Sequence, residues 1–294
     1  MKMVTTRGYK AVKNCELHLD IYPSTEKMRQ PCILWLHGGG LILGSRLMLP
    51  PEQAQRYTQA GYCIVAADYR LAPETKLAEI MTDVLDAYQW IQTHGDEINV
   101  DTTRIALIGH SAGAYLALSV AGRIRPSPKA LISFYGYGDI SREWAVAPSH
   151  FYRQQGLIPS SDAYRAISRT VISQSSIQER MQFYLYCRQN GLWVKEIVGK
   201  EFKDYPILTA KYRPIHAISP GYPATLLIHG DADTDVPVSE SMSLAEKLSE
   251  AGVSHSVLIL PGYGHAFDIE GSGMQDALVS HAFDTVIDFL NHYV

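Results

Sequence analysis

The sequence predicts a single α/β domain, 1–294, built on a mostly parallel central sheet with helices on both faces. Short apolar runs rich in β-branched residues alternate with helical patterns, which indicates strands that are covered on both faces and joined by right-handed crossovers. A serine between two glycines lies where one such run passes into a helical pattern. The chain has 294 residues, 46% of them hydrophobic, and is therefore long enough to bury a full core.

The elements are predicted in chain order. Alternating hydrophobicity at 15–22 predicts an antiparallel strand at one edge of the sheet. The continuously apolar strand candidates are 33–36, 62–67, 104–108, 129–134, 224–228 and 256–260. The clearest helix covers 77–93, where apolar side chains recur every three or four residues. The last strand would form the other edge, on which a second copy of the chain could pair, so a homodimer is one expectation.

One segment interrupts the alternation of strands and helices. Residues 140–217 separate two successive strands by far more chain than a crossover needs, so we interpret them as an insertion. The insertion combines helical stretches such as 175–189 with many aromatic residues, which we expect to form its own small core. We predict a helical cap that shields a site at the carboxyl edge of the sheet from water.

The strongest motif is Gly-His-Ser-Ala-Gly at 109–113. It follows an apolar strand and precedes a helical pattern, which is the context of a nucleophile elbow. Such a turn projects the serine hydroxyl above the sheet, and glycines on either side tolerate the crowding. Ser111 is therefore the candidate nucleophile.

A serine hydroxyl needs a base to take its proton and an acid to orient that base. Strand 224–228 is followed by three carboxylates, Asp231, Asp233 and Asp235, and strand 256–260 is followed by His265. Both groups follow the carboxyl ends of predicted strands, where open parallel sheets place their ligand site. The order along the chain is therefore Ser, Asp, His.

A glycine loop precedes these residues in the chain. Strand 33–36 runs into His-Gly-Gly-Gly at 37–40, whose backbone N–H groups could face a substrate oxygen that gains negative charge. We assign this role to the amides of Gly39, Gly40 and Ala112, the last of which opens a helix with its positive dipole end. A phosphate-binding loop would need a Gly-Lys-Ser/Thr ending or Gly-x-Gly-x-x-Gly spacing, and neither is present.

These motifs together resemble a known family. His-Gly-Gly-Gly at 37–40, Asp-Tyr-Arg-Leu-Ala-Pro-Glu at 68–74 and the elbow resemble the hormone-sensitive-lipase-like branch of the α/β-hydrolases, and the resemblance covers nearly the whole chain. It implies the α/β-hydrolase fold and a serine carboxylesterase. His110 departs from the Asp that this branch usually has before its nucleophile. That variant, with His-Gly-x-x-Asp and Val-Pro at 229–237, is more similar to prolyl-oligopeptidase and kynurenine-formamidase relatives.

The resemblance favours Asp233 over Asp235 as the acid, because Asp233 matches His-Gly-x-x-Asp. The other two acids are expected to solvate the loop and to cap the helix that starts at 238–240. Asp-x-Asp-x-Asp also opens a calcium loop of the EF-hand type. Val236 and Met242, however, stand where that loop needs its turn glycine and its bidentate glutamate.

The remaining residues indicate neither a metal nor a cofactor. No pair of the eleven histidines has the His-x-x-x-His or His-x-Glu spacing of a zinc site. We expect His37 and His229 to brace the loops that follow their strands. Four separated cysteines, at 15, 32, 63 and 187, are interpreted as reduced core residues.

Charge and hydropathy limit the partners. The net charge is −4 and no Lys/Arg cluster is present, so the sequence indicates binding neither to nucleic acid nor to an anionic membrane. The start lacks an apolar signal core, and no apolar stretch approaches the roughly 20 residues that span a bilayer, so we expect a cytoplasmic protein.

Three functional hypotheses remain. The first is a serine carboxylesterase that cleaves small or medium carboxylic esters through an acyl-enzyme. The second is an amide hydrolase, similar to arylformamidases or peptidases, that uses the same three side chains. The third is a binding protein that keeps the fold without the chemistry.

Overall fold

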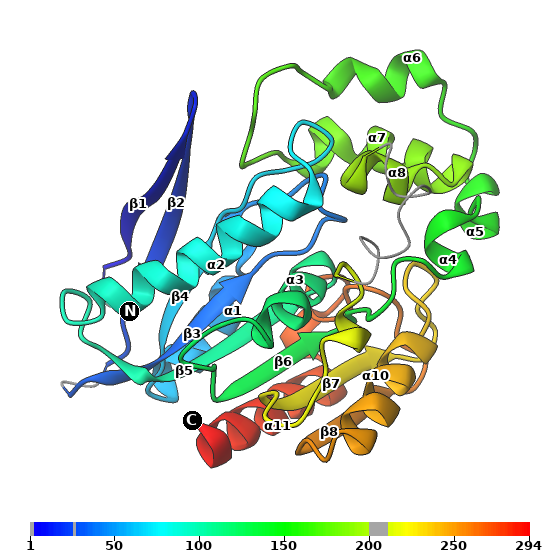
Figure 1. Ribbon diagram of the computed structural model, residues 1–294. Helices are drawn as coiled ribbons and strands as arrows, with labels where there is room; N and C mark the ends of the chain where they lie inside the picture. The colour runs from blue at the N-terminus through cyan, green and yellow to red at the C-terminus, as the bar shows by residue number, and fades with distance from the viewer. Residues whose placement is uncertain (1–2, 26–27, 200–210) are drawn as a thin grey trace.

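An eight-stranded sheet forms the centre of the computed structural model, which describes residues 3–25, 28–199 and 211–294 (Figure 1). The strand order is β1-β2-β4-β3-β5-β6-β7-β8. The pairs β1–β2 and β2–β4 are antiparallel, and all other neighbours are parallel. The strands are β1 Thr5–Val12, β2 Cys15–Tyr22, β3 Gln30–Leu36, β4 Cys63–Ala67, β5 Val100–His110, β6 Ala130–Phe134, β7 Ala224–Gly230 and β8 His255–Leu260.

Helices cover both faces of the sheet. On one face pack α2 (Leu77–His94), α3 (Ala112–Ala121) and α10 (Ser239–Glu250), and on the other α1 (Pro51–Gln59) and α11 (Ala277–Tyr293). Alternate side chains of β3 pack into the hydrophobic clusters on the two faces of the sheet. Leu34 and Leu36 pack on the face of α2, α3 and α10, and Ile33 and Trp35 pack on the face of α1 and α11. The predicted fold class, a mostly parallel sheet with helices on both faces, is confirmed.

The predicted edge strand is correct in direction and wrong in position. β2 pairs antiparallel, but β1 lies outside it and forms the edge. β1 was not predicted because none of its residues is fully buried, so it lacks an apolar face. It is anchored by polar contacts instead: the Tyr9 hydroxyl donates to the Asp68 carbonyl at 2.6 Å, and Lys10 pairs with Asp83 at 2.6 Å. β8 forms the other edge, and pairing of a second copy there stays a prediction.

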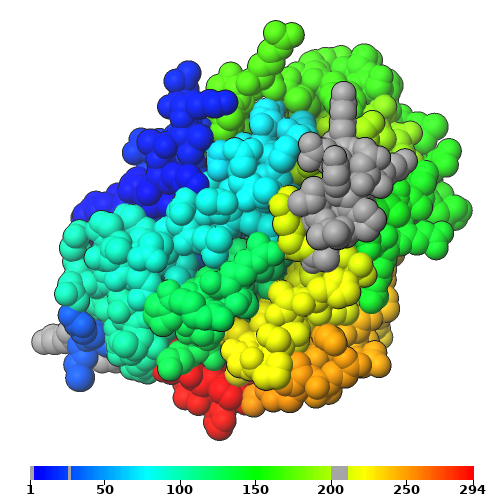
Figure 2. Space-filling model, in the orientation of Figure 1, coloured from blue at the N-terminus to red at the C-terminus, as the bar shows by residue number. Residues whose placement is uncertain are grey.

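The helices of the segment between β6 and β7 gather at one end of the sheet (Figure 1). In Figure 2 the part of this segment around α6 and α7 is green and lies at the top of the view. Part of the predicted cap, residues 200–210, lies outside the described residues. The helix predicted at 175–189 starts at Ile177, because Ser176 and Glu179 form a capping box. The helices here are α4 Glu143–Val146, α5 His150–Arg153, α6 Ser160–Ala163, α7 Ile177–Asn190 and α8 Trp193–Val198.

Short 3-10 helices complete the described elements: η1 Arg46–Met48, η2 Tyr164–Ala166, η4 Pro214–His216 and η5 Gly273–Gln275. All four cysteines are buried and free, and Cys32 and Cys63 are register partners in β3 and β4. Within residues 3–25, 28–199 and 211–294, no helix combines the length and the hydropathy needed to cross a membrane.

Candidate active site

Ser111 occupies a sharp turn between β5 and α3. Its φ of 52° and ψ of −115° are strained for a residue with a side chain. The turn is held from behind, because the Ser111 N–H donates to the Phe134 carbonyl at 2.9 Å. A Cβ on Gly113 would lie 2.2 Å from the Leu36 carbonyl oxygen, so the helix reaches the sheet only with glycine there. This is the geometry of the predicted elbow.

The three predicted side chains meet at the carboxyl ends of β5, β7 and β8. His265 Nε2 lies 2.9 Å from the Ser111 Oγ, and His265 Nδ1 lies 2.6 Å from the Asp233 Oδ2. The other oxygen of Asp233 accepts the backbone N–H groups of Asp235 and Val236 at 2.8 and 2.9 Å. The carboxylate is therefore fixed by the loop that carries it and is free to orient one nitrogen of the imidazole.

Charge and burial perturb both ionisable groups. Burial opposes ionisation of Asp233, but hydrogen bonds from His229 and His265 hold the pKa of its carboxyl well below the ordinary value. Burial likewise disfavours the charged form of His265. The hydrogen bond to Asp233 and the charges of Asp235 and Asp233 nevertheless raise the pKa of His265 above its usual value. The arrangement suits an imidazole that must accept a proton and hold it briefly.

The predicted glycine loop lies beside the serine. Gly38, Gly39 and Gly40 line the same cavity as Ser111 and His265. Among the described residues, the backbone hydrogen bonds outside helices and strands include none in which the amide N–H of Gly39 or Gly40 is the donor. Leu43 N–H donates to the Gly39 carbonyl at 3.0 Å, which closes the loop on itself. Gly39 and Gly40 thus border one cavity with the Ser111 hydroxyl, and Ala112 follows Ser111 directly as the first residue of α3.

His37 and Trp193 brace this loop from two sides. His37 Nδ1 lies 2.7 Å from the Gly38 carbonyl, and its ring stacks on Tyr69 at 4.1 Å. Burial lowers the pKa of His37 to about 4, so it is neutral at pH 7. The indole N–H of Trp193, on α8, donates to the Gly40 carbonyl at 2.8 Å. Bracing by His37 was predicted, whereas the contact from the cap was not.

His229 braces the acid loop as predicted. Its Nδ1 lies 2.7 Å from the Ser241 Oγ, and its Nε2 lies 3.0 Å from the Val236 carbonyl and 3.2 Å from the Asp233 Oδ2. The loop between β7 and α10 is thereby tied to α10 at one end and to the strand at the other. Asp233 takes its position from these contacts.

The role predicted for the neighbouring carboxylates is wrong in part. No side chain caps α10, whose N-cap is Val238. Asp231 accepts the Gly262 N–H at 2.6 Å and links two loops. Asp235 forms a buried ion pair with Arg188 of α7 and accepts the Tyr184 hydroxyl at 2.7 Å. These contacts come from the cap, more than 40 residues away in the chain, and no local pattern could indicate them.

His110, the residue before the serine, pairs with a second buried carboxylate. Its Nε2 lies 3.0 Å from the Asp268 Oδ2, and both side chains are buried. Asp268 also accepts the Tyr135 hydroxyl at 2.5 Å and the Gln53 amide at 2.7 Å. Because Asp268 follows His265 by three residues, this network joins the serine turn to the histidine loop. The sequence analysis did not identify Asp268.

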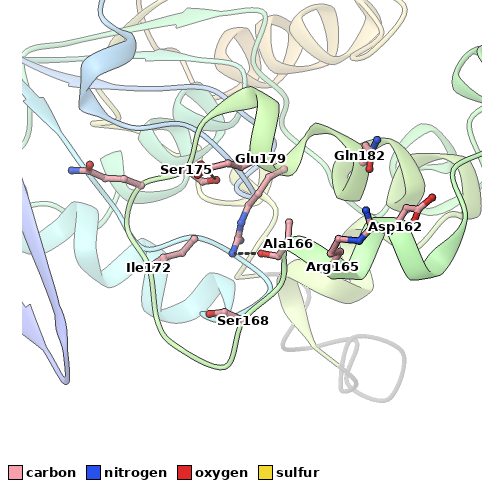
Figure 3. Close-up of a pocket in the computed structure, with 10 residues that line it drawn as sticks. Asp162, Arg165, Ala166, Ser168, Ile172, Ser175, Glu179 and Gln182 are labelled. Carbon is pink, nitrogen blue, oxygen red and sulfur yellow. Dashed lines mark hydrogen bonds and ion pairs between the residues drawn. The ribbon is translucent and has the colours of Figure 1, made fainter.

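The site opens into a cavity of about 570 Å³ between the sheet edge and the cap. The glycine loop, α5, α7 and the residues after His265 form its walls. A second hollow of about 460 Å³, shown in Figure 3, lies between α7 and the chain around Ser168 and Ile172. Two ion pairs involve its charged residues, Asp162 with Arg165 and Arg180 with Glu74, and Glu179 bonds to Ser175 and Ser176 at the start of α7. Ser111 and His265 line the first cavity and do not line this second hollow.

The described residues hold no group of three or more His, Cys, Asp and Glu side chains arranged to bind a metal ion.

Comparisons with known proteins agree with this fold. The BD-FAE family model matches residues 19–248, and the model described as "Dienelactone hydrolase family" matches residues 205–294. Among curated proteins, the non-reducing polyketide synthase Preu6 of Preussia isomera is 29% identical over 90% of this chain. The alignment covers 14% of that synthase, so the chain spans about a seventh of its relative's length.

Solved structures show the same architecture over the whole chain. A Staphylococcus aureus protein with unknown function is 25% identical with a TM-score of 0.82, covering 98% of this chain and 99% of that one. An esterase from Thermogutta terrifontis has a TM-score of 0.70 at 24% identity, covering 98% of this chain and 91% of that one.

Proposed function

We propose that this chain, which belongs to the BD-FAE family of α/β-hydrolases, is a serine hydrolase that cleaves small or medium carboxylic esters. One observation carries the proposal. Ser111, His265 and Asp233 form a continuous hydrogen-bonded series, with contacts of 2.9 and 2.6 Å, at the wall of a cavity. A hydroxyl, an imidazole and a carboxylate in this order are the parts that acyl transfer needs.

The proposed reaction passes through an acyl-enzyme. The Ser111 oxygen attacks the ester carbonyl carbon while His265 Nε2 takes the hydroxyl proton. The carbonyl oxygen becomes an oxyanion that the amides of Gly39, Gly40 and Ala112 receive. The carbon–oxygen bond to the alcohol then breaks, and His265 returns its proton to the departing alkoxide. Water repeats the sequence, with His265 as its base, and the acid leaves Ser111.

The walls of the cavity indicate the kind of substrate. Its volume of about 570 Å³ lies in the range of sites for small organic molecules. On the side of the glycine loop and α7 the walls are apolar, formed by Leu43, Met48, Ile177, Met181 and Leu185. Uncharged acyl groups of modest length fit this surface, because burying them removes apolar area from water.

The test compares the wild type with Ser111→Ala and with Ser119→Ala. Ser119 is a buried serine in α3, the helix that follows Ser111, and its hydroxyl donates to the Tyr115 carbonyl at 2.7 Å. We expect wild type and Ser119→Ala to hydrolyse p-nitrophenyl acetate and to be labelled by a fluorophosphonate. Ser111→Ala should lose both activities. Full turnover by Ser111→Ala would refute the proposed nucleophile.

The same preparations separate the rival hypotheses. Matched ester and anilide substrates are compared by kcat/KM, and a higher value for the anilide would reassign the protein as an amide hydrolase. An intact wild type that neither turns over esters nor reacts with the fluorophosphonate would favour a binding protein. Esters of graded acyl length then define the size of the acyl group.

A further inference from the structure

The wall of the active-site cavity contains a buried ion pair that the proposed reaction does not use. Asp235 and His265 both line the cavity, and the Asp235 Oδ2 lies 3.7 Å from the His265 Nε2. That nitrogen is the one that contacts Ser111, whereas Asp233 contacts the opposite nitrogen. A second carboxylate therefore lies on the reactive side of the imidazole.

Asp235 is held by the cap. Its Oδ1 pairs with Arg188 Nη1, and its backbone carbonyl accepts Arg188 Nη2 at 2.9 Å. The Tyr184 hydroxyl lies 2.7 and 2.8 Å from the two carboxylate oxygens. Donors from one turn of α7 thus occupy both oxygens of Asp235.

Arg188 is itself fixed among aromatic rings. Its guanidinium lies 5.4 to 5.8 Å from the ring centres of four aromatic residues of the cap: Trp144, Tyr152, Tyr184 and Trp193. Only 3% of its side chain is exposed. Such a cation is stabilised by the negative faces of the rings and by the carboxylate together.

We infer that the Arg188–Asp235 pair is a positioning device for the reaction proposed above: Arg188 neutralises and orients a carboxylate that would otherwise compete with Ser111 for His265. A free Asp235 carboxylate would attract the Nε2–H of a protonated His265. Because Arg188 belongs to α7, the cap must be docked for the base to have this environment. Arg188 and Asp235 are positioning residues, since both act through the imidazole.

Other charged or titratable groups face His265 from each surrounding element. Asp233 and Tyr135 contact the imidazole, and Tyr152 of α5 and Glu270 line the same cavity. The Tyr135 hydroxyl also donates to Asp268, which pairs with His110. Substitutions at 188 and 235 leave all of these residues in place, so a change in titration reports the ion pair.

The experiment measures kcat/KM against pH for wild type, Arg188→Met, Asp235→Asn and the double variant. Neutral His265 is the active form, so activity is lost as pH falls through its pKa. Arg188→Met leaves the Asp235 carboxylate without its cation. The acid limb of the pH profile, where kcat/KM falls as His265 becomes protonated, should therefore move up by about one pH unit. Asp235→Asn leaves the cation and should move the limb down. The double variant removes both charges and should return the limb towards wild type.

A matched control comes from the same helix. Arg180 of α7 forms a buried pair with Glu74 at 2.6 Å, and neither residue lines the cavity of Ser111. Arg180→Met removes a buried cation from α7 without placing a free carboxylate near His265, so its acid limb should stay at the wild-type pH. Arg188→Lys keeps the charge and should also stay near wild type.

The imidazole is also titrated directly by NMR, with the His265 resonance assigned from a His265→Gln sample, so that this measurement needs no turnover. Unchanged titration in both Arg188→Met and Asp235→Asn would overturn the inference, as would an equal shift in Arg180→Met. If Arg188→Met does not fold, the pH profiles of wild type, Asp235→Asn and the double variant still test the inference, because the limb of Asp235→Asn should lie lowest. Activity retained by Ser111→Ala would refute the proposed function and leave the NMR comparison valid.

Discussion

Replacing Asp233 with asparagine tests whether the carboxylate sets the tautomer of His265. The Asp233 Oδ1 accepts two backbone N–H groups, from Asp235 at 2.8 Å and Val236 at 2.9 Å. An asparagine satisfies both only with its oxygen in that position. Its NH₂ group then faces His265 Nδ1, where the carboxylate oxygen lies at 2.6 Å in the wild type.

Two donors cannot share that contact, so His265 Nδ1 must lose its proton and act as acceptor. Nε2 then carries the proton and points it at Ser111, whose own proton it can no longer take. Inverting the tautomer in a triad of this kind costs about 10⁴ in kcat, or about 5 kcal/mol of activation free energy. KM should change little, because Asp233 does not line the substrate cavity.

The assay is hydrolysis of p-nitrophenyl acetate at pH 8 with the burst phase resolved, so that acylation is measured separately from deacylation. Asp231→Asn is the matched control, because Asp231 lies in the same loop and contacts Gly262 rather than His265. We expect wild-type kcat from the control. A loss below tenfold in Asp233→Asn, or a larger loss in Asp235→Asn, would show that the tautomer argument is wrong.

Two further predictions concern the surrounding structure. Asp268→Ala should lower the unfolding free energy by about 3 to 5 kcal/mol in urea titrations at pH 7, because it leaves the buried His110, Tyr135 and Gln53 donors unpaired; a loss below about 1 kcal/mol would contradict this. The pair with His110 lowers the pKa of Asp268 in opposition to burial, so this stability is fully present above the unfolded pKa of about 4 and is lost as pH falls through the folded value. Gly39→Ala should reduce kcat by about a hundredfold, since its Cβ would lie 2.1 Å from the Leu43 carbonyl and the amide must move. Gly221→Ala, at φ +86° with open space around its Cβ, is the control, and equal losses in the two variants would exclude a specific role for the glycine loop.

Local patterns are enough to predict most of the sheet and the three central side chains. Strands β3 to β7 are buried on at least one face, β8 is partly buried, and the apolar runs of all six mark them directly. In a parallel sheet the carboxyl ends of the strands share one edge. A serine after β5, an acid after β7 and a histidine after β8 are therefore brought close by topology alone. The choice of Asp233 over Asp235 needed the motif, and the contact at 2.6 Å agrees with it.

β1 and the Asp268 network could not be predicted, for different reasons. No residue of β1 is fully buried, so its sequence carries no alternating apolar pattern. The His110–Asp268 pair joins residues 158 positions apart, and each is an ordinary polar residue in its own segment. Burial of such residues depends on a partner that only the folded chain supplies.

Helix α7 shows why the contacts of the cap escape sequence analysis. Its buried residues include Arg180, Arg188 and Gln189 beside Phe183 and Tyr184, so burial does not follow hydrophobicity. A buried arginine is stable only with an anion in contact, and the two anions, Glu74 and Asp235, lie on loops of the body. An apolar helix face could slide against an apolar surface at little cost. The Arg188–Asp235 pair, with the Tyr184 hydroxyl on the same carboxylate, is the contact that places both side chains of α7 beside the base.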